Sequence, residues 1–131
     1  ILAELRTVVE TAEGRRGSNA RADHMLAGFA ELAVHNRAVA VLAADPAVAL
    51  MLRANRDWSA LIERQLALLT DLDPGPTGRV RASMVLAGIA GASGPAFDDM
   101  DRTELNRQLV DAGRRTLGLR TSRRRTDSEK H

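Results

Sequence analysis

The chain has 131 residues, of which 44% are hydrophobic, so it is long enough for one domain with a core of its own. It contains no cysteine and only 2% aromatic residues, which excludes disulfides, thiolate chemistry and zinc-finger sites and leaves no stacking platform for single-stranded nucleic acid. The formal net charge is +2, no apolar run approaches the roughly 18 residues of a membrane span, and no signal-peptide pattern is present, so we expect a soluble, cytoplasmic domain.

Alanine, leucine, arginine and glutamate dominate the sequence and β-branched alternation is absent, which favours helix throughout. We therefore predict an all-α helical bundle of five to six helices. The hydrophobic spacing places them at about residues 1–13, 20–43, 46–70, 78–94 and 102–118. A sixth helix would result from a break in the second segment near residues 35–37, or in the third near residues 55–57.

Several of these boundaries carry their own signals. Asp45 is a good N-cap, and Pro46 suits the first position of a helix. Asp101 and Glu104, three positions apart, resemble a capping box. Gly118 is well placed to stop the last helix. The signals together predict one helical domain over residues 1–119.

The C-terminal end is strongly basic and polar. We predict that residues 120–131 form a disordered basic tail, because they offer no apolar group to a core. Such a tail can also bind nucleic acid or an acidic surface. The simpler interpretation is a solvated tail with favourable charge at a helix C-terminus.

The segment "RVRASMVLAGIAGASGPAF", residues 79–97, has helical spacing but holds three glycines within seven positions. Each glycine costs a helix about 1 kcal/mol relative to alanine, while a ridge of small side chains lets another helix approach closely. The last helix offers a matching face. We therefore predict a homodimer in which these two helices of each subunit form a four-helix bundle, the alternative being that both pack wholly inside one subunit. The predicted interface comprises Ala82, Val85, Gly88, Ile89, Ala92, Leu105, Leu109, Ala112, Gly113 and Thr116.

The stretch from "LDPGPTGRVRAS" to "GRRTLGLR" resembles the C-terminal end of TetR-family transcriptional repressors. The similar pieces are Arg81-Ala82, Leu86 to Ile89 with Gly91, the acidic break at residues 98–101, and residues 118–120. The resemblance implies a homodimer whose helical C-terminal domain binds a small effector, while an N-terminal helix-turn-helix domain binds operator DNA. No helix-turn-helix precedes Ile1. We therefore expect this chain to be the regulatory half, reaching DNA only through a domain outside this sequence.

An effector pocket of this kind is expected between helices, lined by methionine and aromatic side chains that adapt to a largely apolar ligand. His35, Trp58 and Gln65 would add polar contacts, and the first helix would connect the pocket to the DNA-binding domain. The alternative is that these are ordinary core residues. The predicted ligand-binding set is Met25, Phe29, Leu32, His35, Met51, Trp58, Leu61, Ile62, Gln65 and Met84.

Catalysis has little support in the sequence. Ser83 and Ser93 lack a local histidine partner, and "GIAGASG" lacks the Lys-Ser/Thr pair of a phosphate loop. Glu31 and His35 share a helical stripe, but no further ligands are evident, so we expect a surface pair, no metal site and no cofactor. The competing functional hypothesis is a stand-alone helical interaction or scaffold domain without a small-molecule pocket.

Overall fold

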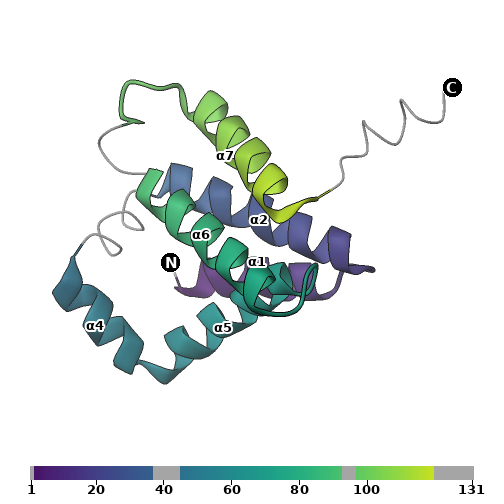
Figure 1. Ribbon diagram of the computed structural model, residues 1–131. Helices are drawn as coiled ribbons and strands as arrows, with labels where there is room; N and C mark the ends of the chain where they lie inside the picture. The colour runs from purple at the N-terminus through teal and green to yellow at the C-terminus, as the bar shows by residue number, and fades with distance from the viewer. Residues whose placement is uncertain (1, 37–44, 93–96, 120–131) are drawn as a thin grey trace, which may run out of the picture.

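The computed structural model describes residues 2–36, 45–92 and 97–119. This described part contains six helices and no strand, which confirms the predicted all-α bundle (Figure 1). None of its helices is long and apolar enough to cross a lipid bilayer. The predicted basic tail at residues 120–131 lies outside the described residues. The helices are α1 (Leu2–Glu13), α2 (Ser18–His35), α4 (Pro46–Ala54), α5 (Arg56–Thr70), α6 (Pro76–Ala92) and α7 (Arg102–Leu117).

The start of α4 and the α4–α5 junction follow from side-chain caps. The Asp45 carboxylate accepts a hydrogen bond of 2.9 Å from the Ala47 N–H, with Pro46 as the first helical residue, so the predicted N-cap is confirmed. Asn55 ends α4 and caps α5, because its side-chain oxygen accepts from the Trp58 N–H at 3.0 Å. The predicted break at residues 55–57 is thus real.

The ends of α7 are also determined by local chemistry. The Asp101 carboxylate accepts from the Glu104 N–H at 3.1 Å, which is one half of the predicted capping box. The Glu104 carboxylate instead accepts from Arg107 and Gln108 of the next turn. Gly118 adopts a φ of 75° and closes the helix in the left-handed conformation that only glycine adopts cheaply.

The core is arranged around α2, which contacts α1, α5, α6 and α7. Figure 1 shows α2 running through the bundle, with α1 and α5 on one side and α7 on the other. The α1–α2 contact is close because α2 carries a glycine there: a Cβ on Gly28 would lie 2.5 Å from Cγ1 of Val8. The largest fully buried apolar side chains, Met25, Leu26, Leu61 and Leu69, come from α2 and α5.

Ion pairs at the surface connect helices that are distant in sequence. Arg64 of α5 donates two hydrogen bonds, of 2.6 and 3.0 Å, to the Glu13 carboxylate of α1 and thereby lowers the pKa of Glu13. Asp71, which directly follows α5, accepts hydrogen bonds from Arg21 and Ser18 of α2, and these hydrogen bonds lower its pKa as well. Both pairs are solvent-exposed, so each adds little to stability.

Helix α4 lies apart from the core. Its main contacts are with α5, and Figure 1 shows the two helices meeting in a V at one end of the bundle. Ala47, Leu50, Met51 and Ala54 form an exposed stripe along its outer side. Helix α4 therefore presents an apolar surface rather than contributing to the core.

Candidate functional site: the groove between α6 and α7

Helix α6 is apolar on both its inner and its outer side, yet it is buried on one side only. Its inner side packs Ala82, Val85 and Ile89 into the core. On its outer side Val80 is 56% exposed and Met84 is 64% exposed. With Gly88 they form an apolar strip one helical turn apart, beside the exposed Arg79 and Arg81 of the same helix. Exposed apolar surface is a common feature of interfaces.

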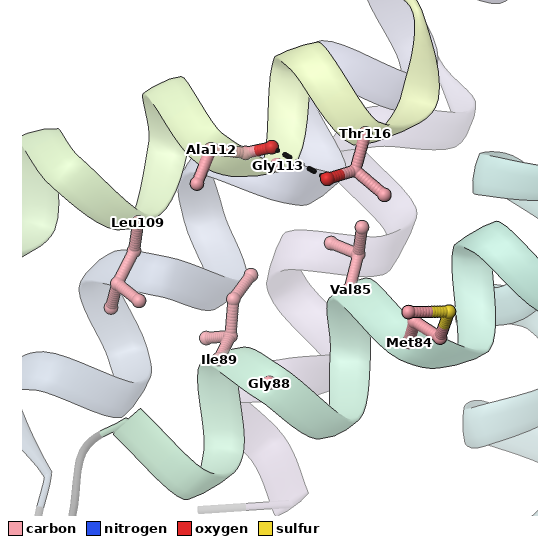
Figure 2. A pocket seen from close by; sticks show the side chains of 8 residues that line it. All are labelled: Met84, Val85, Gly88, Ile89, Leu109, Ala112, Gly113 and Thr116. Carbon is pink, nitrogen blue, oxygen red and sulfur yellow. Dashed lines mark hydrogen bonds between the residues drawn. The ribbon is translucent and has the colours of Figure 1, made fainter.

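A shallow groove runs between α6 and α7, with a volume of about 250 Å³ (Figure 2). Seven of its eight lining residues belong to the interface that the sequence predicts, so the structure brings most of that set together. The eighth is Met84, which the sequence analysis places in the effector pocket instead. The lining residues are Met84, Val85, Gly88, Ile89, Leu109, Ala112, Gly113 and Thr116.

The chemistry of the groove is almost wholly apolar. No charged side chain lines it, and its one polar side chain is Thr116. The Thr116 hydroxyl already donates to the backbone carbonyl of Ala112, one turn earlier in α7, at 2.9 Å (Figure 2). The lining therefore suits an apolar group that fills it and offers little to a charged or strongly polar ligand.

The two glycines that line the groove differ in what a side chain at their position would contact. A Cβ on Gly88 would meet nothing within 4 Å, so its own subunit leaves that space open. A Cβ on Gly113 would lie 2.6 Å from Cδ1 of Leu26, a fully buried residue of α2. Gly113 is thus required by packing inside the chain, whereas the absence of a side chain at Gly88 has no explanation within one subunit.

Helix α7 contacts α2 through an ion pair as well as through the close approach of Gly113 to Leu26. The Arg114 guanidinium spans the Asp23 carboxylate, with Nε 2.7 Å from Oδ1 and Nη2 3.3 Å from Oδ2. The hydrogen bond to Asp23 raises the pKa of Arg114 further above its usual value. This two-point contact joins α7 to α2, but the pair is about as solvent-exposed as the other pairs between helices, so it adds little to stability.

Several residues of the predicted interface are buried within their own subunit. Ala82 and Leu105 are buried, as are Val85 and Ile89, although the last two also line the groove. The side chain of Ala92 lies outside the described residues. The sequence analysis also missed Val110 and Leu117, which are buried on the inner side of α7. Their separation of seven residues, two helical turns, was a signal that could have found them.

The predicted effector residues separate into two groups. Seven belong to the facing helices α2 and α5, where they are buried or packed against the core: Met25, Phe29, Leu32, Trp58, Leu61, Ile62 and Gln65. The other three are exposed and lie apart from that cluster. Met51 is on the outer stripe of α4, Met84 is in the α6–α7 groove, and the His35 ring lies 3.2 Å from the backbone carbonyl of Glu31. Met84 thus lies among the residues that line the α6–α7 groove, apart from the seven predicted residues on α2 and α5.

Gln65 is unusual among these residues. It is only 1% exposed, and its amide nitrogen Nε2 has no hydrogen-bond partner. A buried donor left unpaired costs about 1–3 kcal/mol. Gln65 thus carries a buried amide donor without a hydrogen-bond partner.

The remaining chemistry of the described residues is sparse. They contain no group of three or more His, Asp or Glu side chains placed to hold a metal ion. No family model, curated protein or solved structure matches the chain. The likeness to TetR-family regulators therefore depends on the sequence pattern alone.

Proposed function

We propose that the chain is the effector-binding and dimerisation domain of a TetR-like transcriptional regulator. The domain acts as a homodimer joined through α6 and α7, and it controls a DNA-binding domain that lies outside this sequence. The observation that carries the proposal is the outer side of α6, where Val80, Met84 and Gly88 leave an apolar surface beside an uncharged groove.

A second subunit of the same chain is the simplest partner that would bury this surface. In a twofold dimer the same patch appears on both subunits, so a single apolar face needs no separate partner to be buried. Two helices from each subunit then form a four-helix bundle. The separation of two DNA-binding domains in such a dimer would depend on this contact, since half-sites about 34 Å apart tolerate little displacement.

The effector site is proposed between α2 and α5. Met25, Phe29 and Trp58 provide an adaptable apolar lining, and Gln65 provides the donor. The chemistry favours a largely apolar molecule with one hydrogen-bond acceptor placed to reach Nε2 of Gln65. Entry of the effector requires α2 and α5 to separate, which would move α1 through its contacts with both helices.

Trp58 gives a direct test of effector binding, because it is the single tryptophan and the chain has no tyrosine. A library of apolar compounds, with and without a carbonyl or ether oxygen, is screened by thermal shift, and hits are titrated against Trp58 fluorescence. We expect stabilising hits that carry an acceptor and change the emission. Hits whose affinity is unaffected by Gln65→Leu and Trp58→Ala would contradict the site.

The scaffold hypothesis has one observation in its favour, the exposed stripe of α4 with Leu50 and Met51. A domain whose purpose is to hold another protein would use this surface and would need no effector. Substituting Leu50 and Met51 by serine distinguishes the two functions. The regulator proposal expects dimerisation and effector binding to remain unchanged in this variant.

A further inference from the structure

We propose that the partner subunit's Met84 fills the groove between α6 and α7, so that each subunit supplies both a projecting side chain and the hollow that receives it. The inference depends on the proposed homodimer and specifies its central contact. It is drawn from the size and chemistry of the groove and from the place of Met84 beside it.

The groove is small for a ligand pocket. Its volume of about 250 Å³ lies below the roughly 300–1,000 Å³ of pockets for drug-sized ligands. Its lining is uncharged, and the hydroxyl of Thr116 is already donating to Ala112. A long, flexible, apolar side chain is the group that such a lining selects, and methionine adapts well to an irregular hollow.

The chain carries such a side chain next to the hollow. Met84 is 64% exposed, and it is one of the largest apolar side chains left open on the described surface. Figure 2 shows it at one end of the groove, beside Val85, with Leu109 and Ile89 toward the other end. A protruding apolar group and a matching hollow on one face of one chain form a self-complementary surface, as a twofold contact requires.

Gly88 explains how the partner helix approaches. It lies four residues after Met84, one helical turn farther along the groove, and its own subunit leaves the space above it empty. A twofold axis close to Gly88 places the two α6 helices in contact at their smallest residue. The same axis carries the partner's Met84 across to the region of Leu109 and Ala112, inside the groove.

The first test compares two methionines of nearly equal exposure. Met84→Ala is expected to raise the dimer dissociation constant on the order of a hundredfold, because the side chain is removed from two symmetric hollows. Met51→Ala is the control, since Met51 is 67% exposed on α4; its dimer constant should equal that of the wild type. Both constants are measured by sedimentation equilibrium. Equal constants for Met84→Ala and wild type would overturn the inference.

The second test uses the absence of cysteine in the chain. Single variants Met84→Cys and Ala112→Cys are purified separately, mixed, and oxidised with a copper catalyst. The inference predicts a disulfide-linked dimer in the mixture, formed between subunits, and much less in either variant alone, since a disulfide requires Cα atoms within about 7 Å.

The outcomes of these tests distinguish failure of the Met84 contact from failure of the proposed dimer. A wild-type protein that stays monomeric at high concentration overturns the proposed function together with this inference. A wild-type dimer in which the mixture gives no cross-link overturns the Met84 contact alone. A cross-link that forms at least as efficiently in Met84→Cys alone as in the mixture would instead place the two Met84 side chains against each other and would also overturn it.

Discussion

Replacing Gly88 by leucine is expected to have opposite effects on the stability of the subunit and on its self-association. In the isolated subunit the new side chain projects into open space, because a Cβ at this position meets nothing within 4 Å. The substitution also removes a glycine from the body of a helix, which stabilises α6 by about 0.8–1 kcal/mol. We therefore expect Gly88→Leu to raise the free energy of unfolding of the monomer by close to 1 kcal/mol.

The same side chain has the opposite effect on the proposed dimer. It would stand between two closely packed α6 helices, and overpacking of this kind costs about 1–3 kcal/mol at each site. The twofold symmetry introduces the leucine twice, so the total is about 2–6 kcal/mol and the dissociation constant rises by at least roughly 30-fold. Sedimentation velocity over a concentration series measures the association, and urea unfolding of the dilute protein measures the stability.

Ala67→Leu is a suitable control because Ala67 is an exposed helical position on α5. It should leave both the sedimentation coefficient and its concentration dependence unchanged. A Gly88→Leu protein that associates as strongly as the wild type would show that no helix packs over Gly88, and the assignment of this face would be lost.

Three further predictions concern the packing, the buried amide and the surface charge. Gly113→Ala should lower the free energy of unfolding by about 1–3 kcal/mol in urea denaturation, because its Cβ would collide with the buried Leu26 side chain; a variant of wild-type stability would argue against that close approach. Gln65→Leu should raise stability by about 1 kcal/mol in thermal unfolding, since an unpaired buried donor disappears, whereas a large loss would show that the amide is bonded. Asp71→Asn should flatten the acid limb of a stability-against-pH curve. The folded pKa of Asp71 is lowered by Arg21, so its contribution is present above the unfolded pKa of about 3.9 and is lost as pH falls through the folded pKa; acid limbs that superimpose for the two proteins would contradict this.

The helices themselves follow closely from the sequence, because their signals are local. Asp45 with Pro46 begins α4, Asn55 separates α4 from α5, and Gly118 closes α7, each through contacts within a few residues. Such short-range signals can be recognised in a single sequence. The second predicted helix, over residues 20–43, ends in the structure at His35, and residues 37–44 are outside the described part.

The division of α6 and α7 into inner and outer faces was harder to predict. Small and apolar residues cover both sides of α6, so periodicity alone does not say which side meets the core. The prediction therefore combined Ala82 and Leu105, which are buried, with Gly88 and Ala112, which are exposed. Met84, which the sequence predicts in the effector pocket, lines the α6–α7 groove in the structure. Only the packing of α6 on α5 and α7 decides these faces.

The prediction of the effector pocket was limited in a different way, because it was based on residue type. Residue type suggests adaptable apolar side chains, but it does not say whether they enclose a ligand or fill the core. The unpaired Nε2 of Gln65 is the observation from which the effector site is proposed, and it becomes visible only once the surroundings of that side chain are known.

Sedimentation equilibrium of the unmodified domain tests the central claim most directly. Outward-facing apolar groups on α6, beside an uncharged groove, predict a reversible monomer–dimer equilibrium with no higher species, because a twofold contact closes on itself. We expect a weight-average mass that rises with concentration to twice that of the 14.2 kDa chain and then stays constant. A mass that remains at one chain up to the highest soluble concentration would contradict it.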